Sequence, residues 1–490
     1  MEKPLPLNLV SKLCQALDEE RIAYCHWKSN QALDRSASGD NDLDLLVSRS
    51  DVDRFSEILY AHSFKEAHSP VDQQLPGVQD YYGYDPSSGK IIHVHAHFQL
   101  VFGHDMSKNY HLPVEKPYLQ DAIQGELFKV PAPELEFVVF VIRMMIKHST
   151  WDTILAGQGT LSSSERQEFV YLEDRVNRDK LREVIAEHLP FVGAPLLEDC
   201  VQSLRPGCPA WKRIQIGQRL QNSLKPYARR TGITDLFLKL WRRVVNSFQR
   251  RVLRHTARAR LASGGAMIAI VGGDGAGKST AVNGINEWLS PDFEISTVHL
   301  GKPPWSLTTI LIRGLIKIGR TLGFYPFERA PIEYTLDSNS LVFPGYPWMI
   351  REVCTARDRY LTYKKARRFA SNGGLVICDR FPISQVQLMD GPQVERMTSN
   401  YPTNPFIKYL SRLEKKYYQP IKYPELLIVL RADPILSAQR KTDEDSESVV
   451  ARSSEIWNLD WSQLPACIID ANQPKAEVLS ELKALIWASL

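Results

Sequence analysis

The stretch IVGGDGAGKST at residues 270–280 has the composition of a phosphate-binding loop. Its glycines let the backbone approach a phosphate closely, and a helix that begins in the loop adds the positive end of its dipole. The stretch matches the G-x-x-x-x-G-K-[ST] pattern, in which the lysine bridges the β- and γ-phosphates of ATP and the hydroxyl binds Mg²⁺. We therefore predict Lys278 as a catalytic residue and Ser279 as a magnesium ligand. The predicted ATP-binding residues are Gly272, Gly273, Asp274, Gly275, Ala276, Gly277, Lys278, Ser279 and Thr280.

A second candidate is Asp379, which ends the apolar run GLVICD at 374–379. Open α/β sheets bind ligands at the carboxyl ends of their parallel strands. A carboxylate in that position can hold Mg²⁺ or a water bound to it, because Mg²⁺ prefers oxygen ligands. We expect Asp379 to complete the metal site and the adjacent Arg380 to face an anionic acceptor.

A third group of candidates lies in GDNDLDLLV at 39–47. Asp42 and Asp44 alternate along an expected strand, so both carboxylates share one face and are predicted to bind a metal, with Mg²⁺ the first choice. The run KIIHVHAHFQL at 90–100 places His93, His95 and His97 on one strand face as well. These histidines could present imidazole to a transition metal, or serve as ordinary surface and hydrogen-bonded groups.

The elements that must position the glycine loop alternate between strand and helix. Apolar runs that indicate strands occur at 267–272, 294–300, 374–379, 425–431 and 466–470. Continuous apolar strands separated by helices predict a parallel sheet covered on both faces. Residues 263–490 are therefore expected to form an α/β domain with the P-loop NTPase fold.

The N-terminal half has a different pattern, with short strands and helices over residues 1–130 and a hairpin turn, DPSSG, at 85–89. This pattern predicts an α+β domain. Helical periodicity follows over 131–204 as a helical extension, and 205–262 form a basic helical linker. Between Arg205 and Arg260 the chain has about 15 lysine and arginine residues against one acidic residue, Asp235.

The basic linker contains an amphipathic stretch. Its apolar residues recur at spacings of three and four, and basic residues surround them. The apolar residues are Phe237, Leu240, Trp241, Val244, Phe248 and Val252. Residues 237–260 could pack between the two domains or contact an anionic membrane surface. Nucleic acid is not an expected partner, because no RNA- or DNA-binding module accompanies the helix.

The seven cysteines of the 490 residues are scattered and form no CxxC pair. This distribution predicts a reducing, cytoplasmic environment without a disulfide framework or a zinc cluster of cysteines. The sequence begins without the pattern of a secretory signal, and no apolar run reaches the roughly 18 residues of a spanning helix. A homodimer is one oligomeric state that the sequence leaves open.

The C-terminal motifs resemble the thymidylate kinase family. GGDGAGKST, ARDRY at 356–360, CDRF at 378–381 and SAQRK at 437–441 occur in the family's order and at similar spacing. The resemblance implies that Asp379 and Arg380 contact the acceptor phosphate and the metal region, and that Arg359 faces the acceptor. It also implies a lid at about 440–455, where Arg440 and Arg452 contact ATP and the transferring phosphate, and an adenine-side loop at 469–474.

One motif departs from that family. Where the family has an acidic, glycine-rich stretch beside the acceptor, this chain has HLGKPPWS at 299–306, and Lys302 replaces the family's glutamate. The resemblance therefore implies ATP as phosphate donor and leaves the acceptor open between dTMP, a different nucleotide, and a sugar or glycan, of which the last is favoured. A nucleotide-sensing regulatory or binding protein is the alternative function.

The segment HWKSNQALDRSASGDNDLDLLV at 26–47 resembles the nucleotidyltransferase fold signature, with Ser29 and Asn30 in its turn. Two features depart from the signature: KSN replaces its usual Gly-Ser turn, and His93 stands where a third acid is expected. A histidine does not replace a carboxylate for Mg²⁺. Three hypotheses therefore stay open for this domain. It could be an active transferase, which would make the protein bifunctional. It could instead be a fold retained for binding, or the two acids could stand on a strand that binds no ligand. His95 matches a histidine of family members found near polysaccharide genes, which suggests a role in polysaccharide biosynthesis.

Overall fold

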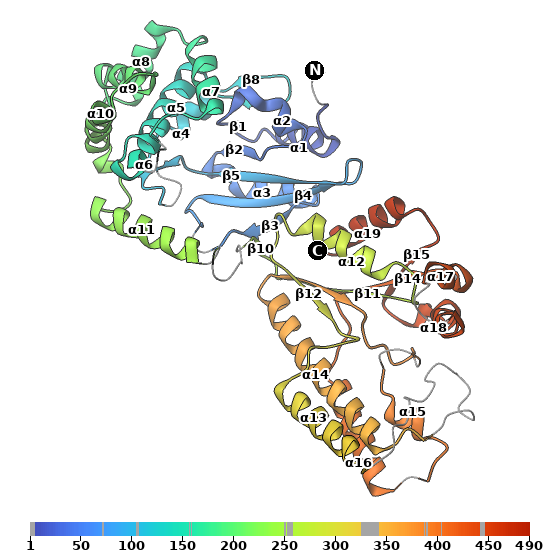
Figure 1. Ribbon diagram of the computed structural model, residues 1–490. Coiled ribbons are helices and arrows are strands. Elements are labelled where there is room, and N and C mark those ends of the chain that lie inside the picture. Colours follow the sequence, from blue (N-terminus) through green and yellow to red (C-terminus); the bar gives the residue numbers. More distant parts are fainter. Residues whose placement is uncertain are drawn as a thin grey trace. The chain divides into compact units, whose positions relative to one another are not determined.

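The computed structural model divides the chain into two compact units, Met1–Ala257 (unit 1) and Arg258–Leu490 (unit 2), each considered by itself (Figure 1). The described residues are 5–70, 73–103, 107–155, 157, 159–248, 251, 258–324, 343–386, 388, 391–402, 404–441 and 446–490. The predicted α/β class with a parallel sheet is confirmed.

Unit 2 contains a five-stranded sheet in which every pair of neighbouring strands is parallel. In spatial order its strands are β12 (Ile295–His299), β13 (Leu375–Asp379), β11 (Met267–Gly272), β14 (Leu426–Arg431) and β15 (Ala466–Asp470). The central strand β11 is buried along its whole length. Its register with β13 pairs Ile270 with Asp379. The glycine loop, which follows β11, and Asp379, which ends β13, therefore lie at the same edge of the sheet.

Helices cover both faces of this sheet (Figure 1). Met267, Ala269 and Val271 of β11 pack with Tyr363 and Ala366 of α14 (Tyr346–Ser371). The alternate residues of β11 face the opposite side, where α12 (Lys278–Leu289) and α19 (Lys475–Ser489) lie. The remaining elements of unit 2 are β10 (Arg260–Leu261), α13 (Leu307–Thr321), α15 (Val394–Thr398), α16 (Pro405–Tyr418), α17 (Pro434–Arg440) and α18 (Ser446–Asn458).

Unit 1 contains a mixed sheet. Its strands follow the order β1 (Tyr24–His26), β2 (Leu43–Val47), β5 (Lys90–His97), β4 (Val78–Asp85) and β3 (Lys65–His68). Strands β2 and β5 are parallel, and the other neighbouring pairs are antiparallel. The hairpin between β4 and β5 turns at the predicted position, with Asp85 opposite Lys90.

The period-two alternation of β5 separates a core face from a polar face. Ile92, Val94 and Ala96 are buried in one core with α1 (Asn8–Glu19) and α3 (Val52–Ala61). His93, His95 and His97 alternate with them and therefore stand on the opposite face of the sheet.

A helical layer completes unit 1. Its centre is α5 (Pro133–His148), which is buried along most of its length, and this explains its long apolar run. The other elements are α2 (Leu33–Ala37), β6 (Val101–Phe102), β7 (Tyr110–His111), α4 (Glu115–Gln120), β8 (Ile123–Gln124), β9 (Lys129–Val130), α6 (Trp151–Leu155), α7 (Ser163–Glu173), α8 (Arg178–His188), α9 (Ala194–Leu204), α10 (Ala210–Ser223) and α11 (Gly232–Phe248).

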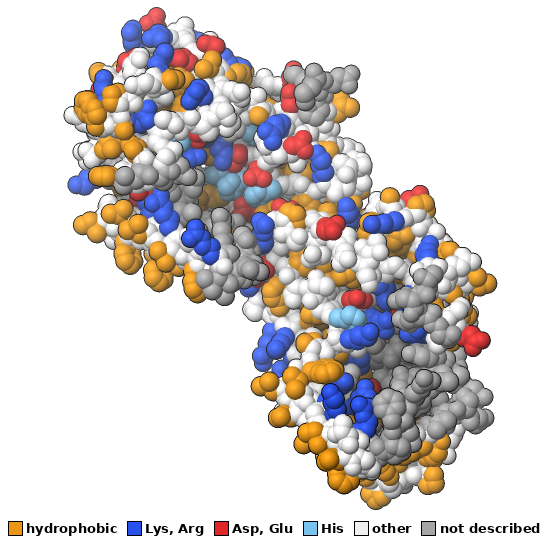
Figure 2. Space-filling model, in the orientation of Figure 1, with side chains coloured by type: hydrophobic (Ala, Val, Ile, Leu, Met, Phe, Trp, Pro, Cys, Tyr) orange, Lys and Arg blue, Asp and Glu red, His pale blue; other side chains and the backbone are white. Residues whose placement is uncertain are grey.

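Helix α11 directs its apolar stripe outward, and Figure 2 shows hydrophobic side chains along its position in Figure 1. The exposed residues are Phe237, Leu240, Trp241, Val244 and Phe248. On its inner side, Arg243 forms an ion pair with Asp152 at 2.6 Å. Residues 249–250 and 252–257 of the predicted basic segment, Val252 among them, lie outside the described residues. No helix in the described ranges is long and apolar enough to span a bilayer.

Candidate functional site

The glycine loop of unit 2 connects β11 to α12 through a tightly packed backbone. Gly275 and Gly277 have φ values of 81° and 88°, in the left-handed region that favours glycine. A Cβ atom at Gly273 would overlap Ser453 of α18, and one at Gly275 would overlap the carbonyl of Ser437 in α17. The loop is therefore held against two helices that lie far away in the sequence.

Lys278 begins α12 and folds back over the loop. Its Nζ donates hydrogen bonds to the carbonyl oxygens of Gly272 at 3.0 Å and Gly273 at 2.7 Å. The side chain is buried, and burial lowers the pKa of Lys278 to about 8. Ser279 and Thr280, in contrast, are exposed in the first turn of the helix.

Three predicted cations converge on Asp274, which is 4% exposed. Its carboxylate lies 2.9 Å from Arg380 Nη2, 2.6 Å from Arg452 Nη1 and 3.5 Å from Lys278 Nζ. Burial alone would raise the pKa of Asp274, but the three positive charges outweigh burial and lower it. Arg380 has φ 64°, a value that residues other than glycine seldom adopt. The sequence placed Asp274 in the loop but did not predict this convergence.

Asp379 lies at the carboxyl end of β13, as predicted. Its buried Oδ1 atom has no hydrogen-bond partner among the described residues, and its Oδ2 atom lies 4.0 Å from His299 Nε2. An unpaired carboxylate oxygen at a strand end suits a hard oxygen-seeking cation such as Mg²⁺. His299 was not predicted, because its position beside Asp379 depends on the register of β12 with β13.

Arg440 lies beside a cavity of about 290 Å³ next to the loop. Gly275, Thr280, Ala471 and Gln473 also line this cavity, and Arg440 Nη1 donates to the Ala471 carbonyl at 3.0 Å. Part of the loop predicted for the adenine side thus borders the cavity. The predicted lid includes residues 442–445, which lie outside the described residues.

Arg359 is buried at the loop that follows β12. It donates hydrogen bonds to the carbonyl oxygens of Leu300 at 2.5 Å and Gly301 at 3.1 Å, and its guanidinium lies over the Tyr418 ring. Arg359 therefore links this loop to α16 through its hydrogen bonds and its contact with Tyr418. Its contact with an acceptor stays a prediction.

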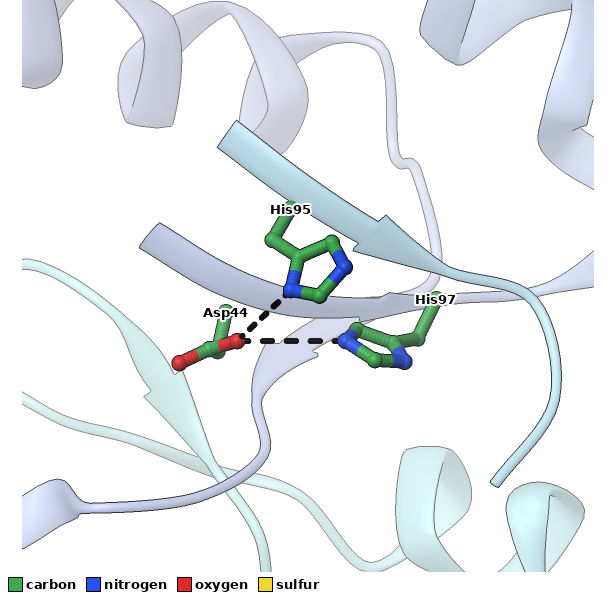
Figure 3. Close-up of side chains that lie close together, drawn as sticks. All are labelled: Asp44, His95 and His97. Carbon is green, nitrogen blue, oxygen red and sulfur yellow. Dashed lines mark ion pairs between the residues drawn. The ribbon is translucent and has the colours of Figure 1, made fainter. Parts of the chain in front are cut away.

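The polar face of the unit 1 sheet carries a row of residues on three adjacent strands. Asp44 of β2 is in register with His95 of β5, and His95 is in register with Asp80 of β4. His95 Nδ1 lies 3.4 Å from Asp44 Oδ1, and His95 Nε2 lies 3.6 Å from Asp80 Oδ1. His97 Nε2 approaches the same Asp44 oxygen at 3.8 Å (Figure 3). Asp80 was missed because its role depends on strand register.

Asp42 and Asp44, predicted to share a metal, have different partners. Asp42 pairs with His93 Nδ1 at 3.1 Å, and His93 Nε2 also pairs with Asp80 at 3.0 Å. Asp44 pairs with the ammonium group of Lys28 at 2.8 Å. A magnesium ion bound by Asp42 and Asp44 stays a prediction, and the structure adds cationic side chains beside each of these acids.

Burial and neighbouring charges have opposing effects on the pKa values of His93, His97 and Asp44. Burial alone would lower the pKa of His93, but its bonds to Asp42 and Asp80 outweigh burial and raise the pKa to about 10. Burial dominates at His97 and lowers its pKa to about 3. Burial alone would raise the pKa of Asp44, but Lys28 and the neighbouring histidines hold it well below its usual value.

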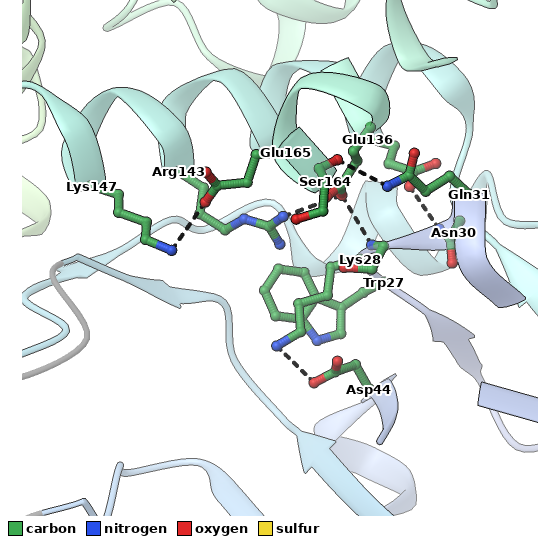
Figure 4. Close-up of polar contacts among 12 residues, drawn as sticks. Trp27, Lys28, Asn30, Gln31, Asp44, Glu136, Arg143, Lys147, Ser164 and Glu165 are labelled. Carbon is green, nitrogen blue, oxygen red and sulfur yellow. Dashed lines mark hydrogen bonds and ion pairs between the residues drawn. The ribbon is translucent and has the colours of Figure 1, made fainter. Parts of the chain in front are cut away.

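The helical layer holds the turn that precedes these acids. Ser29 N donates to Glu168 Oε1 at 3.1 Å, and Gln31 Nε2 donates to the Ser164 carbonyl at 3.2 Å (Figure 4). Asn30 Nδ2 donates to Glu136 Oε1 at 2.8 Å, and burial raises the pKa of Glu136 to about 8. The altered turn is therefore positioned by side chains of α5 and α7.

A cavity of about 870 Å³ opens above this polar face. Asp44, His95 and His97 line it, and Figure 2 shows pale-blue histidine and red acidic side chains in a hollow of unit 1. Basic side chains also line it: Lys28, Arg35, Lys108, Arg143 and Lys147. Five acidic side chains line it as well (Asp40, Asp42, Asp44, Glu165 and Glu168), and Lys28, Arg143 and Lys147 are paired with three of them, so the lining has no excess of positive charge.

Replacing His93 by leucine tests the pair of carboxylates that it bridges. Asp80 would lose its charged partner while its side chain remains only 11% exposed, so we expect unfolding to become easier by about 2 kcal/mol. Because folding raises the pKa of His93 from 6.5 to about 10, its contribution is complete below about pH 6.5 and disappears as the pH rises through about 10. Urea unfolding followed by tryptophan fluorescence at pH 6 and pH 10 measures both effects. Equal stability of the two proteins at pH 6 would refute the ion-pair role.

Comparisons with known proteins support nucleotide binding. No protein-family model matches the chain. It is 26% identical over 233 residues to the uncharacterized ATP-binding protein YghR of Escherichia coli, a match that covers 45% of this chain and 86% of that protein. It is 28% identical over 228 residues to the uncharacterized ATP-binding protein YghS of the same organism, covering 46% of this chain and 93% of that protein.

Proposed function

We propose that unit 2 binds ATP with Mg²⁺ and transfers the γ-phosphate to a small acceptor, as a P-loop kinase of the thymidylate kinase type. The glycine loop, the buried Lys278 and the similarity to two proteins named as ATP-binding support the nucleotide part of this proposal. The motif resemblance supports the kinase part.

The observation that carries the proposal is the convergence of Lys278, Arg380 and Arg452 on Asp274. Phosphoryl transfer is accelerated mostly by positioning and by neutralising charge on the transferred group. Lys278 and the loop would be enough to bind a triphosphate. The two arginines come from the end of β13 and from α18, and they add the positive charge that a transferring phosphate requires. Nucleotide sensing, the alternative function, does not require this additional positive charge.

The magnesium site would use oxygen ligands from two elements. Asp379 Oδ1 is buried and unpaired among the described residues, and Ser279 is exposed at the start of α12. These donors fit Mg²⁺, which would neutralise charge on the β- and γ-phosphates. In this scheme Lys278 holds the terminal phosphates, and Arg380 and Arg452 orient the group being transferred.

The acceptor would enter a cavity of about 350 Å³ whose lining includes residues that directly follow Arg380 in the chain. Phe381, Gly391, Lys415 and Tyr418 are among its lining residues. Its lining combines the aromatic side chains Phe381 and Tyr418 with Lys415, which pairs with Glu395. We favour a sugar or glycan-linked acceptor, on resemblance alone, and keep dTMP as the alternative.

Transfer of ³²P from labelled ATP to a panel of acceptors tests the function. The panel contains dTMP, other nucleoside monophosphates, sugars and glycan extracts, and the full chain is compared with its Lys278→Ala variant. Labelled product that forms only with wild type identifies the acceptor. Tight ATP binding without transfer to any acceptor would instead favour a nucleotide sensor.

The ionisation of Lys278 predicts a pH dependence of ATP affinity. Because the pKa is about 8 without ligand and phosphate binding favours the ammonium form, wild type should bind ATP about tenfold more weakly at pH 9 than at pH 7. The affinity of a Lys278→Met variant should be lower and should not show this decrease. Titration calorimetry at both pH values measures the ratio, and equal wild-type affinities would contradict the assignment.

Unit 1 has two further proposed roles. Its cavity could support nucleotidyl transfer, which would make the chain bifunctional, or bind a ligand without catalysis. We also propose that the exposed apolar stripe of α11 contacts an anionic membrane surface. Vesicle flotation with and without anionic lipid separates such contact from a purely structural helix.

A further inference from the structure

Asp44, His95 and His97 form a compact group of potential metal ligands in unit 1. One donor atom from each residue, a carboxylate oxygen or a ring nitrogen, lies within 4.8 Å of the others. Figure 3 shows ring nitrogens of both histidines directed at one oxygen of Asp44. The group stands on two neighbouring strands, β2 and β5, whose register fixes Asp44 beside His95.

Two of the donor–donor distances are close to those of a tetrahedral metal site. Zinc binds imidazole nitrogen and carboxylate oxygen at about 2.0–2.2 Å, so two ligand atoms of a tetrahedron lie about 3.4 Å apart. Asp44 Oδ1 lies 3.4 Å from His95 Nδ1 and 3.8 Å from His97 Nε2. All three donor atoms lie within 4.8 Å of one another, so side-chain rotation would bring the remaining pair to the separation of a metal site.

His97 provides an independent indication. Its side chain is 5% exposed, and its buried Nε2 atom makes no hydrogen bond within the described part of the chain. A buried ring nitrogen without a hydrogen-bond partner is costly unless another group satisfies it. The nitrogen is directed toward Asp44, beside the cavity that both residues line.

The surroundings also suit a metal. His95 Nδ1 faces the group, and its other ring nitrogen, Nε2, lies 3.6 Å from Asp80 Oδ1. A carboxylate behind a ligand histidine orients the ring and increases its basicity. The cavity leaves room for water or a substrate oxygen at a fourth position, as in zinc sites with three protein ligands.

We propose that Asp44, His95 and His97 bind one divalent transition-metal ion of the zinc class, with an open position toward the cavity of unit 1. Two imidazoles and one carboxylate favour such an ion over Mg²⁺, which prefers oxygen ligands. The site uses His95 and His97 and excludes His93, which Asp42 and Asp80 already hold. The proposal is independent of ATP binding by unit 2.

Lys28 gives the proposal a specific consequence. Its ammonium group lies 2.8 Å from Asp44 Oδ1, the oxygen that the metal would use. The lysine must leave this oxygen when the metal binds, and its partly exposed side chain can extend into the cavity. Replacing Lys28 by methionine should therefore tighten metal binding by about tenfold, because a competing positive charge is removed.

Cobalt titration of the full chain tests the site. The protein is purified without a histidine tag, stripped with a chelator and titrated with Co²⁺ in the absence of nucleotide. We expect one equivalent to bind with the visible absorption of a low-coordinate cobalt site, and Zn²⁺ to displace it. His95→Gln and His97→Gln should each weaken binding at least about tenfold, because each removes a ligand.

His68→Gln is the matched control, because it removes an exposed histidine of β3 in the same unit and should leave cobalt affinity within about twofold. Thermal melts establish that each variant is folded. If His97→Gln fails to fold, the half-buried His95 decides the question. The proposal is overturned if neither wild type nor Lys28→Met binds one equivalent of Co²⁺. It is also overturned if His95→Gln binds Co²⁺ as wild type does.

Discussion

Replacing Lys278 by alanine should lower the turnover of phosphate transfer by about 10²–10³-fold, which is the effect of removing one preorganised donor to a transition state. The lysine is buried against the loop and pairs with Asp274, so its position does not depend on the acceptor. Its loss would also leave Arg380 and Arg452 as the two remaining cations near Asp274. Steady-state kinetics with the acceptor found by ³²P transfer measures the effect.

A matched control is Lys408→Ala, which removes an exposed lysine of α16 in the same unit. Its turnover should stay within about twofold of wild type, because surface charges away from a site have small effects. A Lys278→Ala enzyme with wild-type turnover would remove the kinase proposal, because Lys278 is the lysine that the loop pattern assigns to the β- and γ-phosphates.

Replacing Asp379 by asparagine should lower kcat/KM by about 10²-fold at limiting Mg²⁺, because a neutral amide is a weaker ligand for a hard cation than a carboxylate. The substitution preserves the size of the side chain at the end of β13. Excess Mg²⁺ should recover part of the lost activity. A magnesium titration of the rate at fixed ATP gives the shift directly.

Two further measurements separate a metal role from a structural one. The thermal stability of Asp379→Asn without nucleotide should match or exceed that of wild type, because the variant removes a buried carboxylate oxygen that has no hydrogen-bond partner among the described residues. His299→Ala, which removes the histidine 4.0 Å from Asp379, should keep the wild-type magnesium dependence. An unchanged magnesium titration in Asp379→Asn would count against this ligand.

The parallel sheet and the glycine loop could be predicted from the sequence because their causes are local. All five apolar runs are strands of the sheet, and the three central ones, β13, β11 and β14, are buried on both faces, whereas the edge strands β12 and β15 are only partly buried. The loop needs glycines at positions such as 275 and 277, where φ is positive. Local residue types therefore determine both features.

The partners of the charged residues could not be predicted in the same way. Asp274 meets Arg380 and Arg452 only because α18 and the end of β13 pack beside the loop. In unit 1, Asp80 joins Asp44 and His95 through the register of three strands. Such contacts depend on tertiary structure, and a pattern of residue types along the chain does not encode which strand lies next to which.

The nucleotidyltransferase resemblance illustrates the same limit. The alternation at Asp42 and Asp44 indicated two acids on one face, but not that His93 would bind Asp42 and that Lys28 would bind Asp44. The substitution of a histidine for the expected third acid was visible in the sequence. Its role as a bridge between Asp42 and Asp80 became visible only in the structure.

Titration calorimetry of the full chain with ATP and Mg²⁺ tests the central claim most directly. We predict saturable binding of one ATP per chain that requires Mg²⁺ for full affinity and that is at least about tenfold weaker in Lys278→Ala, because a charged hydrogen-bond donor to the phosphates is lost. Absence of binding heat in folded wild-type protein, at more than one temperature, would contradict the account. So would equal affinity of the wild type and the variant.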